Sequence, residues 1–266
     1  MPLLPKVARA ALHFWEEPVI SGKNGSGTVF FSGCSLSCAF CQNYGVSNGD
    51  IGKTVSYNRL AEIFKELEQA GAHNINLVSP THYVLAIKKA LDIYRPKIPV
   101  VYNSGGYDGV KALEILKDYV DVYLMDLKYL SSDRALRYSS APDYPQMAKN
   151  AILEAIRQQP ECIIKDGIMQ KGVIIRHLIL PQGTKEAMAV FDWVKENAPQ
   201  SFLSIMSQYT PCGRAYDMPE INRKITKREY EKVLDYICGF DFPNVFIQES
   251  ASASEEYIPD FNLQGV

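Results

Sequence analysis

Short runs of β-branched and aromatic residues alternate along this chain with longer segments whose apolar residues recur at helical spacing. The alternation repeats six times. The expected strands are residues 28–32, 74–79, 99–103, 122–127, 173–180 and 202–207, with a short last strand at 245–248. The expected helices are residues 56–69, 83–94, 110–117, 144–157, 185–196 and 227–238, the last with Thr226 as its N-cap.

Several of these strands are apolar without alternation, which is typical of a parallel sheet covered on both faces. Successive strand–helix units with short connections then predict one α/β domain, whose sheet is either open or curved into a partial barrel. We expect this single domain to span residues 1–266. It includes an N-terminal extension to about residue 26 and a tail over about residues 250–266.

The composition is that of a globular protein, because 47% hydrophobic and 22% charged residues in a chain of 266 can bury a substantial core. A formal net charge of −2 offers no basic surface for nucleic acid. No apolar run approaches the roughly 18 residues that span a bilayer, and residues 1–11 lack the apolar core of a secretory signal. We therefore expect a cytoplasmic protein with no nucleic-acid or membrane partner and with reduced cysteines.

Three of the six cysteines, Cys34, Cys38 and Cys41, lie close together directly after the first expected strand. Such clustering favours metal binding over a disulfide framework. The spacing C-x3-C-x2-C places three thiolates on one short loop, and thiolates are the usual ligands of iron–sulfur clusters. Three ligands leave one iron of a four-iron cluster open to another molecule. The alternative, a structural zinc site, normally needs four protein ligands, and the nearest histidines, His13 and His73, are distant in the sequence.

Polar residues interrupt the apolar strands at or near their carboxyl ends. In β/α barrels the loops at that end surround one opening, which carries the chemistry. Strand ends that simply reach solvent would explain a single case, but would explain less easily a carboxylate inside VYLMDLKY (122–129). The residues concerned are Cys34, Ser79, Thr81, Asn103, Asp126, Lys128, Arg176, His177 and Gln208.

The loop GCSLSCAFCQNY (33–44), with Phe40 just before its last cysteine, resembles the signature of the radical S-adenosylmethionine (SAM) superfamily. The wider chain is similar to the subgroup named pyruvate formate-lyase-activating-enzyme-like. The resemblance implies a partial (β/α)6 TIM-like barrel of parallel strands, with a [4Fe-4S] cluster and SAM as cofactors. The segments that carry it are HFWEEPVISGKNGSGTVFFSGC (13–34), NLVSPTHY (76–83), YNSGGYD (102–108), YLMDLKY (123–129) and SIMSQYTP (204–211).

The resemblance also implies an oxidoreductase activity. In this superfamily one electron from the cluster cleaves SAM to methionine and a 5′-deoxyadenosyl radical, which abstracts a hydrogen atom from a substrate. For the subgroup that substrate would be a glycine of a partner protein, and the expected reductant is flavodoxin or ferredoxin. A small molecule or a peptide is the alternative substrate, because the inserted cysteine-rich region of many such activases is absent from this sequence. A function of another class is that of a non-catalytic iron–sulfur electron carrier.

Carried onto this sequence, the resemblance makes Cys34, Cys38 and Cys41 the cluster ligands. It places Phe40 near the adenine of SAM, where an aromatic face can stack on the base, although ordinary core packing explains Phe40 equally well. Many members of the superfamily have Gly-Gly-Glu at the end of the second strand, where the SAM amino group binds. This chain has Ser79-Pro80-Thr81 there. The hydroxyl or carbonyl groups of Ser79 and Thr81 would accept the hydrogen bond instead.

The later strands supply the remaining expected contacts. Asn103 corresponds to a position that often contacts the SAM carboxylate or ribose, and Asp126 and Lys128 to a pair beside its methionine moiety. Arg176 is expected to point into the barrel and His177 away from it, because neighbouring residues of a strand face opposite ways. Gln208 stands at the end of the sixth strand, where relatives often have a histidine. Cys212, just beyond, is expected to be an idle thiol.

Overall fold

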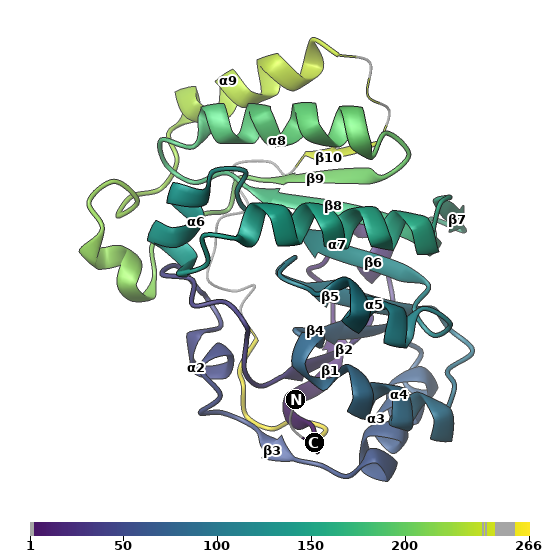
Figure 1. The fold of residues 1–266 in the computed structure, drawn as a ribbon. Helices are drawn as coiled ribbons and strands as arrows, with labels where there is room; N and C mark the ends of the chain where they lie inside the picture. Colours follow the sequence, from purple (N-terminus) through teal and green to yellow (C-terminus); the bar gives the residue numbers. More distant parts are fainter. Residues whose placement is uncertain (1–2, 241, 243, 248–258) are drawn as a thin grey trace.

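The computed structural model describes residues 3–240, 242, 244–247 and 259–266 (Figure 1). Within these residues one curved sheet runs in the order β10-β9-β8-β6-β5-β4-β2-β1-β3. From β2 to β10 along this order every neighbouring pair is parallel. The parallel strands are β2 (Ser26–Phe31), β4 (Ile75–Val78), β5 (Val100–Ser104), β6 (Val122–Asp126), β8 (Ile168–Leu178), β9 (Phe202–Met206) and β10 (Val245–Ile247).

Helices follow the parallel strands and cover the outer face of the sheet (Figure 1). Apolar side chains of the helices pack with the outward residues of the strands in the main hydrophobic core. The long outer helices are α3 (Tyr57–Gln69), α4 (Val84–Ile93), α5 (Val110–Leu116), α7 (Tyr144–Gln158), α8 (Thr184–Asn197) and α9 (Lys227–Cys238). The fold class predicted from the sequence, an α/β protein with a mostly parallel sheet curved as in a partial TIM barrel, is confirmed.

The predicted strands and helices correspond to these elements within two residues at each end, except at the start of β8. This strand begins at Ile168 and ends at Leu178, earlier than predicted at both ends. The N-cap prediction for α9 is also confirmed, since Thr226 and Glu229 form a reciprocal capping box. The predicted last strand is β10, and its residue 248 lies outside the described residues. Elements that the sequence did not predict are β1 (Lys6–His13), α1 (Pro18–Ser21), α2 (Tyr44–Ser47), β3 (Lys53–Thr54), α6 (Ser132–Ser139) and β7 (Ile163–Lys165).

The N-terminal extension is therefore an ordered part of the barrel. Strand β1 pairs antiparallel with β2 and so extends the parallel sheet by one strand at the β2 edge. The helix α1 then closes the amino end of the barrel, because Val19 and Ile20 pack against inward residues of the sheet. Those inward residues are Val101, Val122, Leu124 and Ile174.

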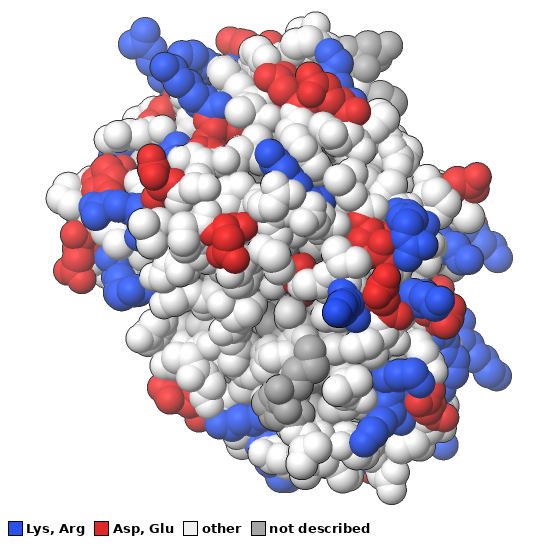
Figure 2. Space-filling model, in the orientation of Figure 1, with Lys and Arg blue, Asp and Glu red and all other residues white. Residues whose placement is uncertain are grey.

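The C-terminal end of the chain also packs on β1. The Ala10 amide donates to the carbonyl of Gln264 (2.8 Å), and the Phe261 ring meets Phe30 edge-on at 5.3 Å between centroids. The tail expected over about residues 250–266 is thus docked over residues 259–266, and its earlier part lies outside the described residues. No helix among the residues that the structure describes is long and apolar enough to cross a membrane. Acidic and basic side chains are interspersed over the face in Figure 2.

Candidate functional site

A cavity of about 180 Å³ opens at the carboxyl ends of the parallel strands. It brings together most of the polar residues that the sequence analysis singled out, from elements that are far apart in the chain. Of the predicted site residues, only Phe40, Thr81 and Gln208 do not line it. Those that line it are Cys34, Cys38, Cys41, Ser79, Asn103, Asp126, Lys128 and Arg176.

The cysteine loop is held from outside the barrel by backbone contacts. The Ala39 amide donates to the carbonyl of Tyr138 in α6 (2.7 Å), and the Ala39 carbonyl accepts from the amide of Ala215 (3.1 Å). Ala215 belongs to a 3-10 turn, η2 (Gly213–Asp217). At the start of the loop Gly33 has φ +92°, and a Cβ there would lie 3.0 Å from the His82 ring. The loop therefore has a defined path that turns its three thiols toward the cavity.

The environment of the three thiols suits the binding of a positively charged metal centre. Cys34 is exposed, whereas Cys38 and Cys41 are half-buried. Burial raises the pKa of the Cys38 thiol, and the Lys128 ammonium and a contact with the Ser139 hydroxyl (3.1 Å) oppose this rise. A bound metal cluster would neutralise thiolates that are otherwise costly to bury.

The donor set therefore fits an iron–sulfur cluster held by three cysteines. Among the described residues, no three His, Cys, Asp or Glu side chains converge closely enough to hold a single metal ion. A structural zinc site normally needs four protein ligands, whereas this loop supplies three cysteines.

Next to the thiols, four charged side chains of alternating sign follow one another across the barrel. Lys128 donates to Asp126, which also accepts from Arg176 Nε at 2.8 Å. Arg176 Nη1 in turn lies 3.2 Å from Glu16 Oε2. Each of these side chains is at most 20% exposed, so the ion pairs are poorly screened by water.

These ion pairs keep the side chains of Asp126, Lys128 and Arg176 charged. Burial alone would raise the pKa of Asp126, but the charges of Arg176 and Lys128 outweigh it and hold that pKa below its usual value. Burial would lower the pKa of Lys128, and the charges of Asp126 and Cys38 raise it instead. Burial is likewise overcome at Arg176, whose pKa is raised. The cavity thus presents a cation, Lys128, whose ammonium within the described residues donates only to Asp126 and has further N–H groups.

A buried carboxylate, Asp108, ties together the ends of β4 and β5 beside this cavity through hydrogen bonds. Asp108 accepts hydrogen bonds from the hydroxyls of Thr81 (2.6 Å), Tyr102 (2.7 Å) and Ser104. The proton of the Thr81 hydroxyl is therefore bound to Asp108, and Thr81 lines a small neighbouring cavity with Cys34 and Ser79. Ser79 has φ +57°, a strained value for a residue other than glycine, and its amide donates to the Asn103 carbonyl (2.9 Å).

The remaining predicted residues lie around this centre. Phe40 meets Tyr209 edge-on (5.8 Å between centroids) and also lines a small cavity with Asp126 and Lys128. His177 is buried on the outer side of the sheet, with Nδ1 2.7 Å from the Leu127 carbonyl. Gln208 follows β9 and is half-buried outside the cavity.

Two carboxylates at the floor of the site were not predicted from the sequence. Glu16 and Glu17 precede α1, and the turn into this helix carries them beneath the cavity. The available signal was two adjacent acidic residues followed by Pro18, which is favoured in the first turn of a helix. Glu17 is buried, its Oε2 has no hydrogen-bond partner among the described residues, and burial raises its pKa.

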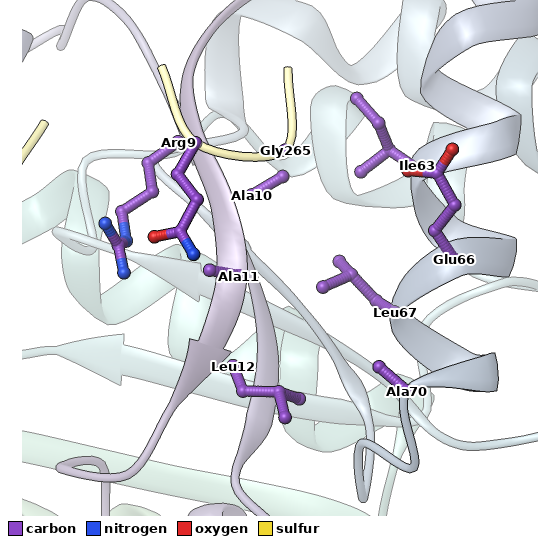
Figure 3. Close-up of a pocket in the computed structure, with 10 residues that line it drawn as sticks. Arg9, Ala10, Ala11, Leu12, Ile63, Glu66, Leu67, Ala70 and Gly265 are labelled. Carbon is purple, nitrogen blue, oxygen red and sulfur yellow. The ribbon is translucent and has the colours of Figure 1, made fainter. Parts of the chain in front are cut away.

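A larger cavity of about 350 Å³ lies elsewhere, between β1, α3 and the C-terminal residues (Figure 3). The side chains of Ile63 and Leu67 on α3 point toward β1 across it (Figure 3). Its walls are mostly alanine and aliphatic side chains, with Arg9 and Glu66 at its edges. Because these walls hold no thiol, histidine or hydroxyl group, we assign the chemistry to the cavity beside the cysteines.

The family model described as the radical SAM superfamily matches residues 28–190, more than half of the chain. The protein therefore belongs to the radical SAM superfamily, whose members generally use a [4Fe-4S] cluster and SAM. The match begins in β2 and includes the three cysteines and every other strand that lines the cavity.

An uncharacterized protein of Methanocaldococcus jannaschii is 34% identical over 233 residues, which are 84% of this chain and 64% of that protein. Methylornithine synthase has a similar structure, with a TM-score of 0.57 and 15% identity over 90% of this chain and 65% of that one. Streptococcus suis SuiB bound to its precursor peptide SuiA gives a TM-score of 0.54 and 17% identity, over 82% of this chain and 47% of that one. At these identities the two structures support the fold alone.

Proposed function

We propose that this protein is a radical SAM enzyme in which Cys34, Cys38 and Cys41 hold a [4Fe-4S] cluster and the adjacent cavity binds SAM. When bound, the cluster would supply the electron that splits SAM into methionine and a 5′-deoxyadenosyl radical, which then takes a hydrogen atom from the substrate. The observation that carries the proposal is the shared cavity: three thiols and the ammonium of Lys128 line one opening.

The chain's own residues suggest how SAM would be oriented. Lys128 offers N–H donors to a carboxylate, and Asp126 keeps the ammonium charged and fixed in position. Asn103 and Ser79 line the same cavity from neighbouring strands. Because Ser79 lines this cavity and Thr81 does not, we assign acceptance of the SAM amino group to backbone carbonyls and to Ser79. Phe40 and the apolar cavity beside Lys128 would accept the adenine.

For the substrate we favour a glycine in a partner protein, as in the pyruvate formate-lyase-activating-enzyme-like subgroup, with flavodoxin or ferredoxin as the reductant. The support is the match of YLMDLKY (123–129) to that subgroup. The geometry is compatible with it, because the cysteine loop lies at the surface and Cys34 is exposed. Modification of a peptide or a small molecule by the same chemistry is the second candidate.

The alternative of a simple electron carrier is less well supported. Electron transfer does not require a cavity lined by charged and amide groups beside the cluster, and an electron carrier would usually bind its cluster with four thiolates. Lys128, Asp126 and Arg176 provide such a lined cavity.

A spectroscopic experiment distinguishes these functions. The cluster is reconstituted anaerobically and reduced with dithionite, and its electron paramagnetic resonance spectrum is recorded with and without SAM. The proposal predicts a spectrum that changes on adding SAM, and loss of the cluster in Cys38→Ala but not in the control Cys162→Ala, whose thiol lies against the backbone near Val173 and Gln200. A fully loaded cluster whose spectrum ignores SAM would favour the carrier.

Substrate type needs a separate measurement. The loaded enzyme is mixed with SAM, reductant and a candidate glycyl radical protein, and the protein radical is sought by the same resonance method. A glycine-centred signal supports the activase reaction. SAM cleavage that is stimulated by a peptide or a small molecule, without such a signal, supports the second candidate.

A further inference from the structure

We propose that Glu16, which lies outside the cysteine motif and outside every strand that lines the cavity, is a positioning residue for SAM binding. This inference rests on the proposed function. It states that Glu16 acts through Arg176 and Asn103, which line the cavity, and does not itself touch SAM.

Among the described residues, the carboxylate of Glu16 contacts only residues of the barrel interior. Its Oε1 accepts from the side-chain amides of Asn76 and Asn103, each at 3.1 Å, and its Oε2 lies 3.2 Å from Arg176 Nη1. These partners come from β4, β5 and β8. One carboxylate from the N-terminal segment thus joins three strands at one level of the barrel, and its side chain is only 12% exposed.

Arg176 is held at all three of its nitrogens. Nε donates to Asp126 Oδ1 (2.8 Å), Nη2 to Asn103 Oδ1 (2.7 Å), and Nη1 faces Glu16. A guanidinium fixed in this way has a single orientation. It therefore presents Asp126 to Lys128 in one geometry, and Asn103 is fixed as well because it bonds to both Arg176 and Glu16.

Charge balance gives Glu16 a second effect. Without Glu16, Asp126 would be the only carboxylate among the described residues in a direct ion pair with the buried cations Arg176 and Lys128, with Glu17 as the other acidic group near Arg176. Asp126 would be drawn toward Arg176, and its hold on Lys128 would weaken. Removal of Glu16 would thus loosen the position of the Lys128 ammonium, the proposed contact of the SAM carboxylate, through Arg176 and Asp126.

The variant Glu16→Gln tests this inference, because it keeps the size of the side chain and removes the charge. The Oδ1 of Asn76 has no hydrogen-bond partner among the described residues and offers the new amide an acceptor, so we expect the variant to fold. The matched control is Glu154→Gln. Glu154 is also a buried carboxylate paired with an arginine (Arg157, 2.7 Å), but it lies on the outer helix α7.

The first readout is the affinity for SAM of the cluster-loaded protein before any reductant is added. Loss of one charge-assisted contact predicts a dissociation constant raised roughly tenfold in Glu16→Gln, and unchanged within twofold in Glu154→Gln. In an Arg176→Lys background, a single ammonium nitrogen cannot reach the three partners that the guanidinium contacts through separate nitrogens, so adding Glu16→Gln should change the constant by less than about twofold.

The second readout needs no cofactor. In the cluster-free protein labelled with ¹⁵N-arginine, the Arg176 Nε–H resonance, assigned by its loss in Arg176→Lys, should exchange faster with water in Glu16→Gln than in the wild type or in Glu154→Gln. A role of Glu16 confined to stability would lower the melting temperature and move neither readout.

Two kinds of failure can be told apart. A wild-type protein that carries the cluster and does not bind SAM overturns the proposed function. A wild-type protein that binds SAM, together with a folded Glu16→Gln variant of equal affinity, overturns the role of Glu16 alone. If Glu16→Gln does not fold, Glu16→Asp takes its place: its shorter carboxylate should raise the dissociation constant, and an unchanged constant contradicts the inference.

Discussion

The hydroxyl of Tyr144 is expected to be a main stabilising group at the cavity rim. It lies 2.9 Å from the Gly105 carbonyl and 2.8 Å from the Asp126 carbonyl, and it accepts from the Lys128 amide at 2.9 Å. Tyr144 is fully buried, so no water can replace this hydroxyl when it is removed. Tyr144→Phe therefore leaves buried backbone groups at the ends of β5 and β6 without partners.

An unsatisfied buried group costs about 1–3 kcal/mol, so we expect Tyr144→Phe to lose about 2 kcal/mol of unfolding free energy. In a protein of this size that corresponds to a melting temperature lower by roughly 4–8 °C. The assay is thermal unfolding of the cluster-free protein followed by circular dichroism. The control is Tyr236→Phe, whose half-buried hydroxyl donates, within the described residues, only to the side chain of Asp192 and whose loss should lower the melting temperature far less. A Tyr144→Phe protein that melts within 1 °C of the wild type would refute the assigned hydrogen bonds.

Three further outcomes follow from the same region. Gly106→Ala should destabilise the protein far more than Gly49→Ala in urea unfolding, because both glycines have positive φ but only at Gly106 would a Cβ collide with the Asp126 carbonyl. Burial lowers the pKa of His177, so the neutral imidazole stabilises the fold fully above about pH 6.5 and this contribution is lost as the pH falls. His177→Asn should therefore flatten the drop in unfolding free energy between pH 7.5 and pH 5.5. An equally steep drop in the variant would contradict this. Lys128→Met should weaken SAM binding by more than roughly tenfold in equilibrium titration, whereas an unchanged affinity would remove Lys128 from the site.

The central strands could be predicted because their sequences match their surroundings. Residues of β5 and β6 are buried on both faces, and continuous apolar runs are typical of such strands. Strand β1, by contrast, has the sequence KVARAALH, whose alanines and leucine suit a helix at least as well. It is a strand because it pairs with β2, and a distant pairing of this kind leaves no local signal.

Some features of the candidate site could also be predicted from the sequence, and others could not. Parallel strands bring their carboxyl ends to one edge, so the convergence of Asp126, Lys128 and Arg176 follows from topology once the strands are known. The commitment of the Thr81 hydroxyl to Asp108 depends on a turn 27 residues further along, which strand patterns do not describe. Glu16 depends on the path of the chain into the amino end of the barrel. That path is set by the packing of α1 against residues of β5, β6 and β8, which are distant in the sequence.

The central claim is that the three thiols and the adjacent cavity together support reductive cleavage of SAM. The most direct test is an anaerobic assay for 5′-deoxyadenosine with reconstituted protein, dithionite and SAM. We predict that the wild type and the Cys162→Ala control form 5′-deoxyadenosine and that Cys34→Ala, Cys38→Ala and Cys41→Ala do not. A wild-type protein that carries the complete cluster and forms no 5′-deoxyadenosine would contradict the claim.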